Sequence, residues 1–147
     1  MKKMNNKGFS LVELIVVVLI MAIIAVALAP QVMKWVENSR KSTDCNNYDS
    51  VVSACNLALS NETVMKDVGA ISGDSFSLTW AGGTPGASWV VTSAPTSFQN
   101  ELKKILGDNW LNEIKVKRTS DGAAWSIKIN KNGTVERTSA PSSDKVS

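Results

Sequence analysis

Residues 7–36 read KGFSLVELIVVVLIMAIIAVALAPQVMKWV, and this stretch decides how the rest of the chain is organised. The 21 residues of Phe9–Ala29 include only two polar side chains, those of Ser10 and Glu13. A helix of about 20 apolar residues is long enough to cross the hydrocarbon core of a bilayer, which is about 30 Å thick. The stretch therefore predicts one membrane-spanning helix near the start of the chain.

The segment before the apolar run is polar and basic. Lys2, Lys3 and Lys7 lie in the first eight positions, so the positive-inside rule places this end in the cytoplasm and the rest outside. They account for the whole formal charge of +3, because the chain from Phe9 onward carries 13 basic and 13 acidic residues. The charge balance of that remaining part gives no indication of nucleic-acid binding.

Pro30 follows the apolar run and lacks the N–H group that a helix interior uses, so a kink near residues 26–30 is predicted. The helix is expected to resume, because apolar side chains recur at helical spacing from Val32 onward. Trp35 fits two interpretations: an aromatic residue at the membrane surface, or a packing residue in the assembled protein.

A second apolar stripe follows on the same predicted helix, and its members step by three and four residues: Cys45, Tyr48, Val52, Cys55 and Leu59. The run Thr43–Asn47 consists of poor helix formers and is a candidate bend or break. In a continuous helix the two cysteines lie about 15 Å apart, whereas a disulfide requires Cα atoms within about 7 Å. Two buried free thiols are therefore expected, unless the helix breaks near Asn46.

The chain beyond residue 60 predicts a small head. Ser75–Trp80 and Ser88–Thr92 alternate like strands and are expected to form a hairpin around the glycine-rich loop 82–86. Ser97 is a candidate N-cap for a helix over Phe98–Leu106, with Gly107 near its end. Three further strands are predicted, the last two joined by the turn Lys131–Gly133: Glu113–Arg118, Ala124–Asn130 and Thr134–Thr138.

The expected fold class is α+β, with a long N-terminal transmembrane helix packed against a small antiparallel sheet. Five segments follow from the pattern: a basic leader (1–8), the apolar half of the helix (9–30), its amphipathic half (31–60), a globular head (61–138) and a polar tail (139–147).

Composition and motifs argue against most enzymes. The chain has no histidine and two cysteines, which removes the commonest general base and prevents a four-ligand zinc site of Cys and His type within one chain. Nucleotide-binding, serine-nucleophile and calcium-loop patterns do not occur in it. We expect no catalytic residue, cofactor or metal site. The basic residues of the last strands are typical of a solvated polar face, so a nucleic-acid partner is not expected.

The segment Gly8–Glu13 resembles the class III signal of type IV prepilins: a basic leader ending in Gly, then Phe, a hydroxyl residue, Leu, any residue and Glu, followed by an unbroken apolar helix. Pro30 is similar to a kink common in the N-terminal helix of that family. The close resemblance covers Lys2–Val36, and the head is similar only in outline. It implies a structural pilin, not an enzyme, that is cut between Gly8 and Phe9, N-methylated at Phe9 and polymerised into a filament.

The resemblance also implies partners and locations. A prepilin peptidase would cut and methylate the chain, other pilin subunits would pack against it, and an assembly ATPase with platform proteins would act indirectly. The precursor would span the cytoplasmic membrane once, and the mature chain would lie in an extracellular filament. Glu13, four residues from Phe9 on a helix, would pair with the freed α-amine of its own chain or of a neighbour, because an unpaired charge in an apolar filament core is costly.

Other interpretations stay open at this point. A pseudopilin of a type II secretion or DNA-uptake (competence) machine shares the same N-terminus, and a membrane-anchored binding protein that never polymerises has a similar span. An ordinary secretory signal peptide would be cut after Ala27-Leu28-Ala29. Pro30 directly after that site and Glu13 within the hydrophobic region disfavour it.

The Gly8–Phe9 junction gives the first prediction. Protein isolated from its native cell should begin at Phe9 and carry a methyl group on that nitrogen, as intact-mass and N-terminal analysis would show. A bulky or charged residue in place of Gly8 should leave uncut precursor in the membrane. A mature chain that begins at Pro30 would identify an ordinary signal peptide instead.

Overall fold

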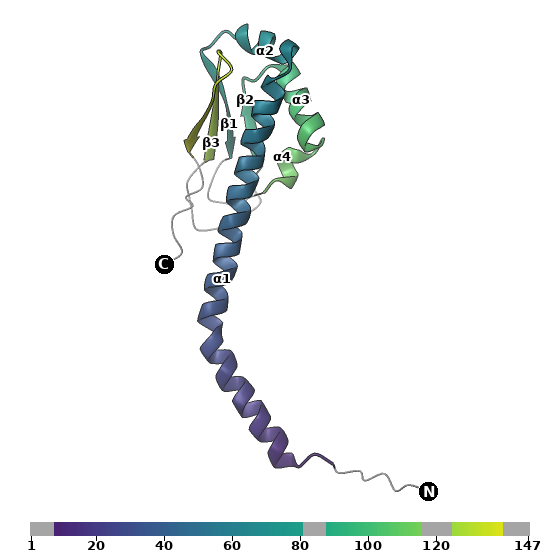
Figure 1. Cartoon of the computed structure of the whole chain (residues 1–147), viewed down its shortest axis with the longest axis vertical. Helices are drawn as coiled ribbons and strands as arrows, with labels where there is room; N and C mark the ends of the chain where they lie inside the picture. The colour runs from purple at the N-terminus through teal and green to yellow at the C-terminus, as the bar shows by residue number, and fades with distance from the viewer. Residues whose placement is uncertain (1–7, 81–87, 116–124, 140–147) are drawn as a thin grey trace, which may run out of the picture. The chain divides into compact units, whose positions relative to one another are not determined.

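The computed structural model describes residues 8–80, 88–115 and 125–139. The chain divides into two compact units, Met1–Glu37 and Asn38–Ser147. One long helix begins in the first unit and ends in the second. The elements in chain order are α1 (Leu11–Leu59), α2 (Glu62–Gly69), β1 (Ser75–Trp80), β2 (Trp89–Thr92), α3 (Thr96–Leu106), α4 (Trp110–Glu113), β3 (Trp125–Asn130) and β4 (Val135–Ser139) (Figure 1).

In the first unit, α1 carries the apolar run. Every residue from Gly8 to Val36 is exposed, including all of the large aliphatic side chains. By its length and composition, the helix is long and apolar enough to cross a membrane. It continues through Pro30, so proline does not end it, and the angle of the expected kink stays a prediction.

In the second unit, α1 runs without interruption through Thr43–Asn47, so the bend proposed for that run does not break the helix. Contacts formed on folding outweigh the poor helix propensity of these residues. Asp44 is fully buried, and the Asn47 side-chain amide donates to the carbonyl oxygen of Lys115 at 3.1 Å. Farther along, the expected stripe is confirmed: Tyr48, Val52, Cys55 and Leu59 are buried, and Cys45 is half-buried.

The strands form one antiparallel sheet in the order β2-β1-β3-β4. The predicted hairpin is confirmed, with Trp80 opposite Trp89 and Ser77 opposite Thr92. Strands β3 and β4 are joined at Gly133, whose φ of 82° favours glycine, as the turn signal predicted. Alternate residues of the two central strands β1 and β3 are buried, so one face of the sheet points into the core and the other toward solvent.

A row of aromatic rings joins α1 to the sheet. Trp80 and Trp125 lie on neighbouring strands with ring centroids 5.2 Å apart. The ring centroid of Tyr48, on α1, lies 6.2 Å from that of Trp125 and 6.3 Å from that of Trp89. The Tyr48 hydroxyl donates a hydrogen bond to the carbonyl oxygen of Ser126 at 3.1 Å. The row ends at Trp110, which lies 6.5 Å from Trp89. Such pairs contribute about 0.5–1.5 kcal/mol each beyond the area they bury.

Two short helices were not predicted, and one predicted cap is wrong. Helix α2 begins at Glu62 and is capped by Asn61, whose side chain accepts a hydrogen bond from the Thr63 N–H at 3.1 Å. Helix α4 carries the buried Trp110. Helix α3 begins at Thr96, with Pro95 at its N-cap position. Ser97 therefore lies inside the first turn and does not cap the helix. Gly107 follows the end of α3, as expected.

One predicted strand is also corrected. Glu113 belongs to α4, and Ile114 and Lys115 lie outside any strand. Residues 116–118 of that prediction, the glycine-rich loop 82–86 and the leader residues 1–7 lie outside the described residues. Strand β4 includes Ser139, where the predicted tail begins, and residues 140–147 of that tail also lie outside the description.

Cys45 and Cys55 do not form a disulfide, as the sequence predicted. They lie ten residues apart on an uninterrupted helix, about 15 Å along its axis, which is too far for a disulfide. Burial raises the pKa of the Cys55 thiol from 9.0 to about 12. Burial also raises the pKa of Tyr48 from 10.0 to about 12, against a smaller opposing effect of the Arg137 charge.

These two groups predict that the head loses stability at alkaline pH. A raised pKa means that the folded chain holds its proton after the unfolded chain has released it, so stability is full below about pH 9 and falls as the pH rises toward 12. Urea unfolding of the detergent-solubilised chain, followed by tryptophan fluorescence, measures this decline. Cys55→Ala should make it shallower, and unfolding at pH 7 gives the packing cost of that substitution separately. An unchanged pH dependence would contradict the assignment to Cys55.

Candidate functional site

The candidate site lies at the start of α1, where the sequence places Gly8, Phe9 and Glu13. Gly8, Phe9 and Ser10 precede the helix, which begins at Leu11. The first helical hydrogen bond runs from the Leu14 N–H to the Ser10 carbonyl oxygen at 3.2 Å. The junction between residues 8 and 9 therefore lies outside the helix in the uncut chain.

Phe9 and Glu13 were expected to lie four residues apart on one helix, and this geometry is corrected. Phe9 is not helical, and its side chain is 87% exposed. Glu13 is in the first turn of α1, and its carboxylate turns back toward the chain start, where Oε2 accepts a hydrogen bond from the Ser10 N–H at 3.1 Å. The carboxylate thus already lies beside the peptide unit that joins Phe9 to Ser10.

Ser10 and Glu13 together form one half of a capping box. In this motif a residue at the N3 position of a helix returns its carboxylate to the N–H of the N-cap residue. Ser10 is at the N-cap position and Glu13 is at N3. The spacing Ser-x-x-Glu is visible in the sequence and signals this arrangement, which the sequence analysis did not identify.

The carboxylate has apolar neighbours. Phe9, Val12, Val16 and Val17 line a shallow depression together with Ser10 and Glu13. A negative charge at a helix N-terminus is favourable, because the unpaired N–H groups of the first turn carry partial positive charge. Among the described residues, Glu13 is the first carboxylate in the chain and precedes twenty residues without any charge. An added positive group at residue 9 would complete an ion pair there.

Gly8 lies in open space. A Cβ atom placed on it would meet no other atom within 4 Å. The described part of the chain therefore gives no steric reason for glycine at this position. A requirement for glycine would have to come from a partner that binds the junction.

The surface that follows the site is apolar and uncovered. Leu14–Ala29 is apolar without exception, and all of its residues are exposed. Burying one aliphatic side chain of this kind contributes about 1.5–3 kcal/mol, so exposure of the whole segment to water costs on the order of tens of kcal/mol. Soluble monomers rarely expose such a continuous patch. The helix fits membrane anchoring or burial among other chains.

The rest of the described chain shows no comparable site. Among residues 8–80, 88–115 and 125–139, no three His, Cys, Asp or Glu side chains are grouped so as to hold a metal ion. A shallow hollow beside α2, β1 and the start of α3 is lined by Asp67, Ser72, Ser75 and Ser93 with small apolar residues. It is open to solvent. The start of α1 is therefore the strongest candidate.

Comparison with known proteins agrees with this location. A family model described as the prokaryotic N-terminal methylation motif matches residues 3–29, which include Gly8, Phe9 and Glu13. This motif is the class III signal of type IV pilins and prepilins, and it supports a type IV pilin-like or pseudopilin protein. Searches of curated proteins and of solved structures give no match to the chain.

The division of exposed and buried surface gives a prediction. The full chain should partition into the detergent-rich phase when a Triton X-114 extract is warmed, because residues 9–36 have no cover of their own. A fragment of Asn38–Ser147 should stay in the aqueous phase, since all the buried core residues lie within it. Near-ultraviolet circular dichroism of its buried tryptophans checks that the fragment is folded. A full chain found in the aqueous phase would contradict the expectation.

Proposed function

We propose that the chain is a structural subunit of a type IV pilus filament, stored in the cytoplasmic membrane as a precursor. The precursor crosses the membrane once, with residues 1–8 inside and the head outside. A prepilin peptidase cuts between Gly8 and Phe9 and methylates the new amine. The chain then leaves the membrane, and its apolar helix packs with those of other subunits in the filament core. It has no enzymatic role.

One observation carries this proposal: a carboxylate lies in the first turn of α1, beside the bond expected to be cut, and the twenty helix residues after it are uncharged and exposed. A charged side chain within a span costs about 2.5–3.5 kcal/mol at the bilayer centre and less near an end. In a helix that only anchors a protein in the membrane, such a charge would make insertion less favourable and bring no benefit. A cut after Gly8 would explain why the charge is present, because it creates a positive α-amine with which the Glu13 carboxylate can pair.

The geometry of the uncut chain supports the pairing. Glu13 already accepts the hydrogen bond of the Ser10 N–H, one residue from the new amine. After the cut the same carboxylate is within reach of the amine of its own chain, or of a neighbouring chain packed alongside. In an apolar core either pairing fixes the axial register of the subunits, since a misplaced partner would leave a charge unpaired.

Burial of the exposed apolar helix supplies the driving force for assembly. Its surface is removed from water by lipid in the precursor and by other copies of the same helix in the filament. The pseudopilin alternative would use the same surface to assemble within a type II secretion or DNA-uptake machine. Imaging of the cell surface by electron microscopy, in strains with and without the gene, separates long surface fibres from that alternative and from a non-polymerising anchor.

Glu13 provides the decisive test. Glu13→Val and Glu13→Gln should insert into the membrane and be cut normally, because the change removes a charge from the span and lies outside the junction. Assembly should fail, since each subunit would bring an unpaired amine into the core at a cost of about 3–5 kcal/mol. That cost weakens each addition by about a hundredfold or more.

The measurement uses a strain that lacks the native copy, with processed protein followed by blot and fibres by microscopy. Glu62→Gln, which removes an exposed carboxylate from the head, is the matched control and should assemble like the wild type. Processed Glu13→Val protein without fibres supports the proposal. Abundant normal fibres from that variant would remove Glu13 from the assembly mechanism.

A further inference from the structure

We infer that Trp35 lies in the headgroup layer of the outer leaflet while the precursor is stored, and that Trp35 and Lys34 together fix the depth of the helix in the bilayer. The partner is thus the phospholipid surface itself. This inference rests on the membrane storage included in the proposed function.

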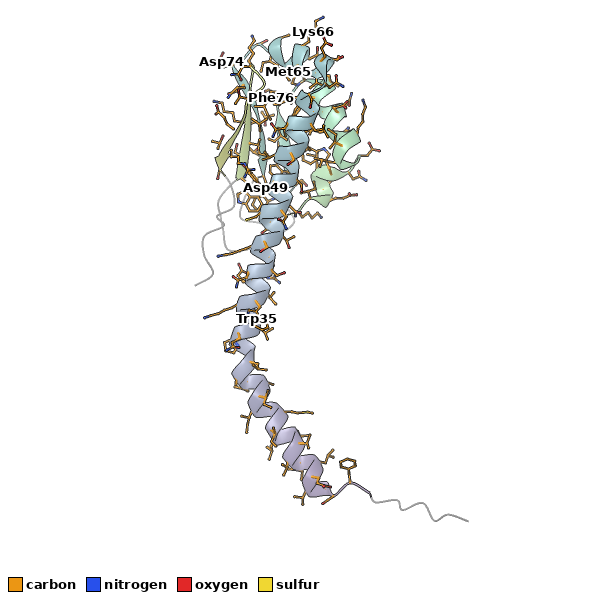
Figure 2. The ribbon with its side chains drawn as sticks, in the orientation of Figure 1. Trp35, Asp49, Met65, Lys66, Asp74 and Phe76 are labelled. Carbon is orange, nitrogen blue, oxygen red and sulfur yellow. The ribbon has the colours of Figure 1, made fainter. Side chains whose placement is uncertain are left out.

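Trp35 differs from every other tryptophan in the chain. Trp80, Trp89, Trp110 and Trp125 are at most 3% exposed and belong to the core of the second unit, whereas Trp35 is 71% exposed. Its indole stands out from the surface of α1 (Figure 2). Trp35 continues the exposed apolar surface of α1 together with Met33 and Val36, and a continuous surface of this kind indicates a partner outside the chain.

The spacing of charges locates that partner. Glu13 and Lys34 are the charged residues that bracket the apolar part of α1, and the twenty residues between them include one polar side chain, Gln31. At 1.5 Å per residue the two charges lie about 32 Å apart along the helix. This distance matches the hydrocarbon thickness of about 30 Å. With Glu13 at the inner boundary, Lys34 and Trp35 lie at the outer one.

The chemistry of the pair suits that boundary. An indole has an apolar body and one N–H donor, so tryptophan favours the layer between hydrocarbon and water. A lysine keeps its ammonium group among the phosphates while its aliphatic stem covers apolar surface. Met33 is 74% exposed and directly precedes the pair, so the apolar surface continues up to the predicted boundary.

The arrangement has a consequence for Glu13. If Trp35 prefers the headgroup layer, outward movement of the helix would take its indole into water, and inward movement would take the Lys34 charge into hydrocarbon. The two residues together therefore keep Glu13 near the inner boundary. The cost of its charge is lower there than at the bilayer centre. The Gly8–Phe9 junction is then held at the cytoplasmic surface.

The full-length precursor, reconstituted into phosphatidylcholine vesicles, allows a direct test. One set of vesicles carries bromine near the headgroup end of the acyl chains, and a second set carries it near the chain terminus. Bromine quenches tryptophan on contact. The Trp35→Tyr variant keeps an interfacial aromatic residue but removes the indole, so the difference from wild type isolates the emission of Trp35.

The emission of Trp35, taken as wild type minus the Trp35→Tyr variant, should be largely quenched by bromine near the headgroups. Bromine near the chain terminus should leave most of it. A depth control places a tryptophan in the span through Val26→Trp in the Trp35→Tyr background. Val26 is 77% exposed, so the larger ring fits on the helix, and it lies nine residues before Trp35, about 14 Å along the axis. This control should show the opposite preference for the two labels.

Two results would overturn the inference alone. If the Val26 control is quenched and Trp35 is not, Trp35 lies in water or is reserved for contacts with protein. If Trp35 is quenched more by the deep label, the boundary is misplaced. If neither position is quenched, the helix is not in the bilayer, and membrane storage fails together with the inference. Filament formation does not enter these measurements, so its failure would be seen separately in the fibre assay.

Discussion

The contact of Tyr48 with the aromatic side chains of the sheet is the interaction on which the head depends. Tyr48 of α1 lies against two strands at once, through the rings of Trp89 and Trp125, and its hydroxyl donates a hydrogen bond to the backbone of β3. The Arg137 guanidinium lies 5.8 Å from the Tyr48 ring and pairs with Asp49 at 2.8 Å, so β4 is tied to the same turn of helix. A four-stranded sheet with one buried face needs such a cover, and α1 provides it together with α3, whose Phe98 packs on Phe76 at 5.0 Å.

The N-terminal half of the same helix is exposed, whereas its C-terminal half packs against the sheet. From Leu11 to Val36 its side chains are exposed within the described part of the chain, although most of them are as apolar as the core of the head. A surface of this kind is tolerated only in lipid or in contact with similar surfaces. Membrane storage and filament assembly are two ways to satisfy one physical requirement, which explains why a single helix can serve both stages of the proposed function.

Glu13 connects the two stages. In the uncut chain its carboxylate stabilises the start of the helix through the Ser10 N–H, a role that any helix could use. Its position beside the junction becomes specific only when a positive amine appears at Phe9. The proposed pairing therefore needs no large rearrangement of the side chain. One carboxylate would act as a helix cap before the cut and as an ion-pair partner after it.

The sequence by itself determined the apolar span, the amphipathic stripe from Tyr48 to Leu59, the hairpin of β1 and β2 and the turn at Gly133, because each depends on local periodicity or on the backbone freedom of glycine. It also located the candidate site, since the signal at Gly8–Glu13 is contiguous. Only the tertiary structure decided that α1 continues through Thr43–Asn47. Contacts between residues far apart in the chain, such as that of Asn47 with Lys115, outweigh the low helix propensity of this run. The tertiary structure likewise brought four tryptophans and Tyr48 into one row and replaced the expected strand at Glu113 by α4. These outcomes depend on which surfaces meet in space, and spacing along a sequence does not record that.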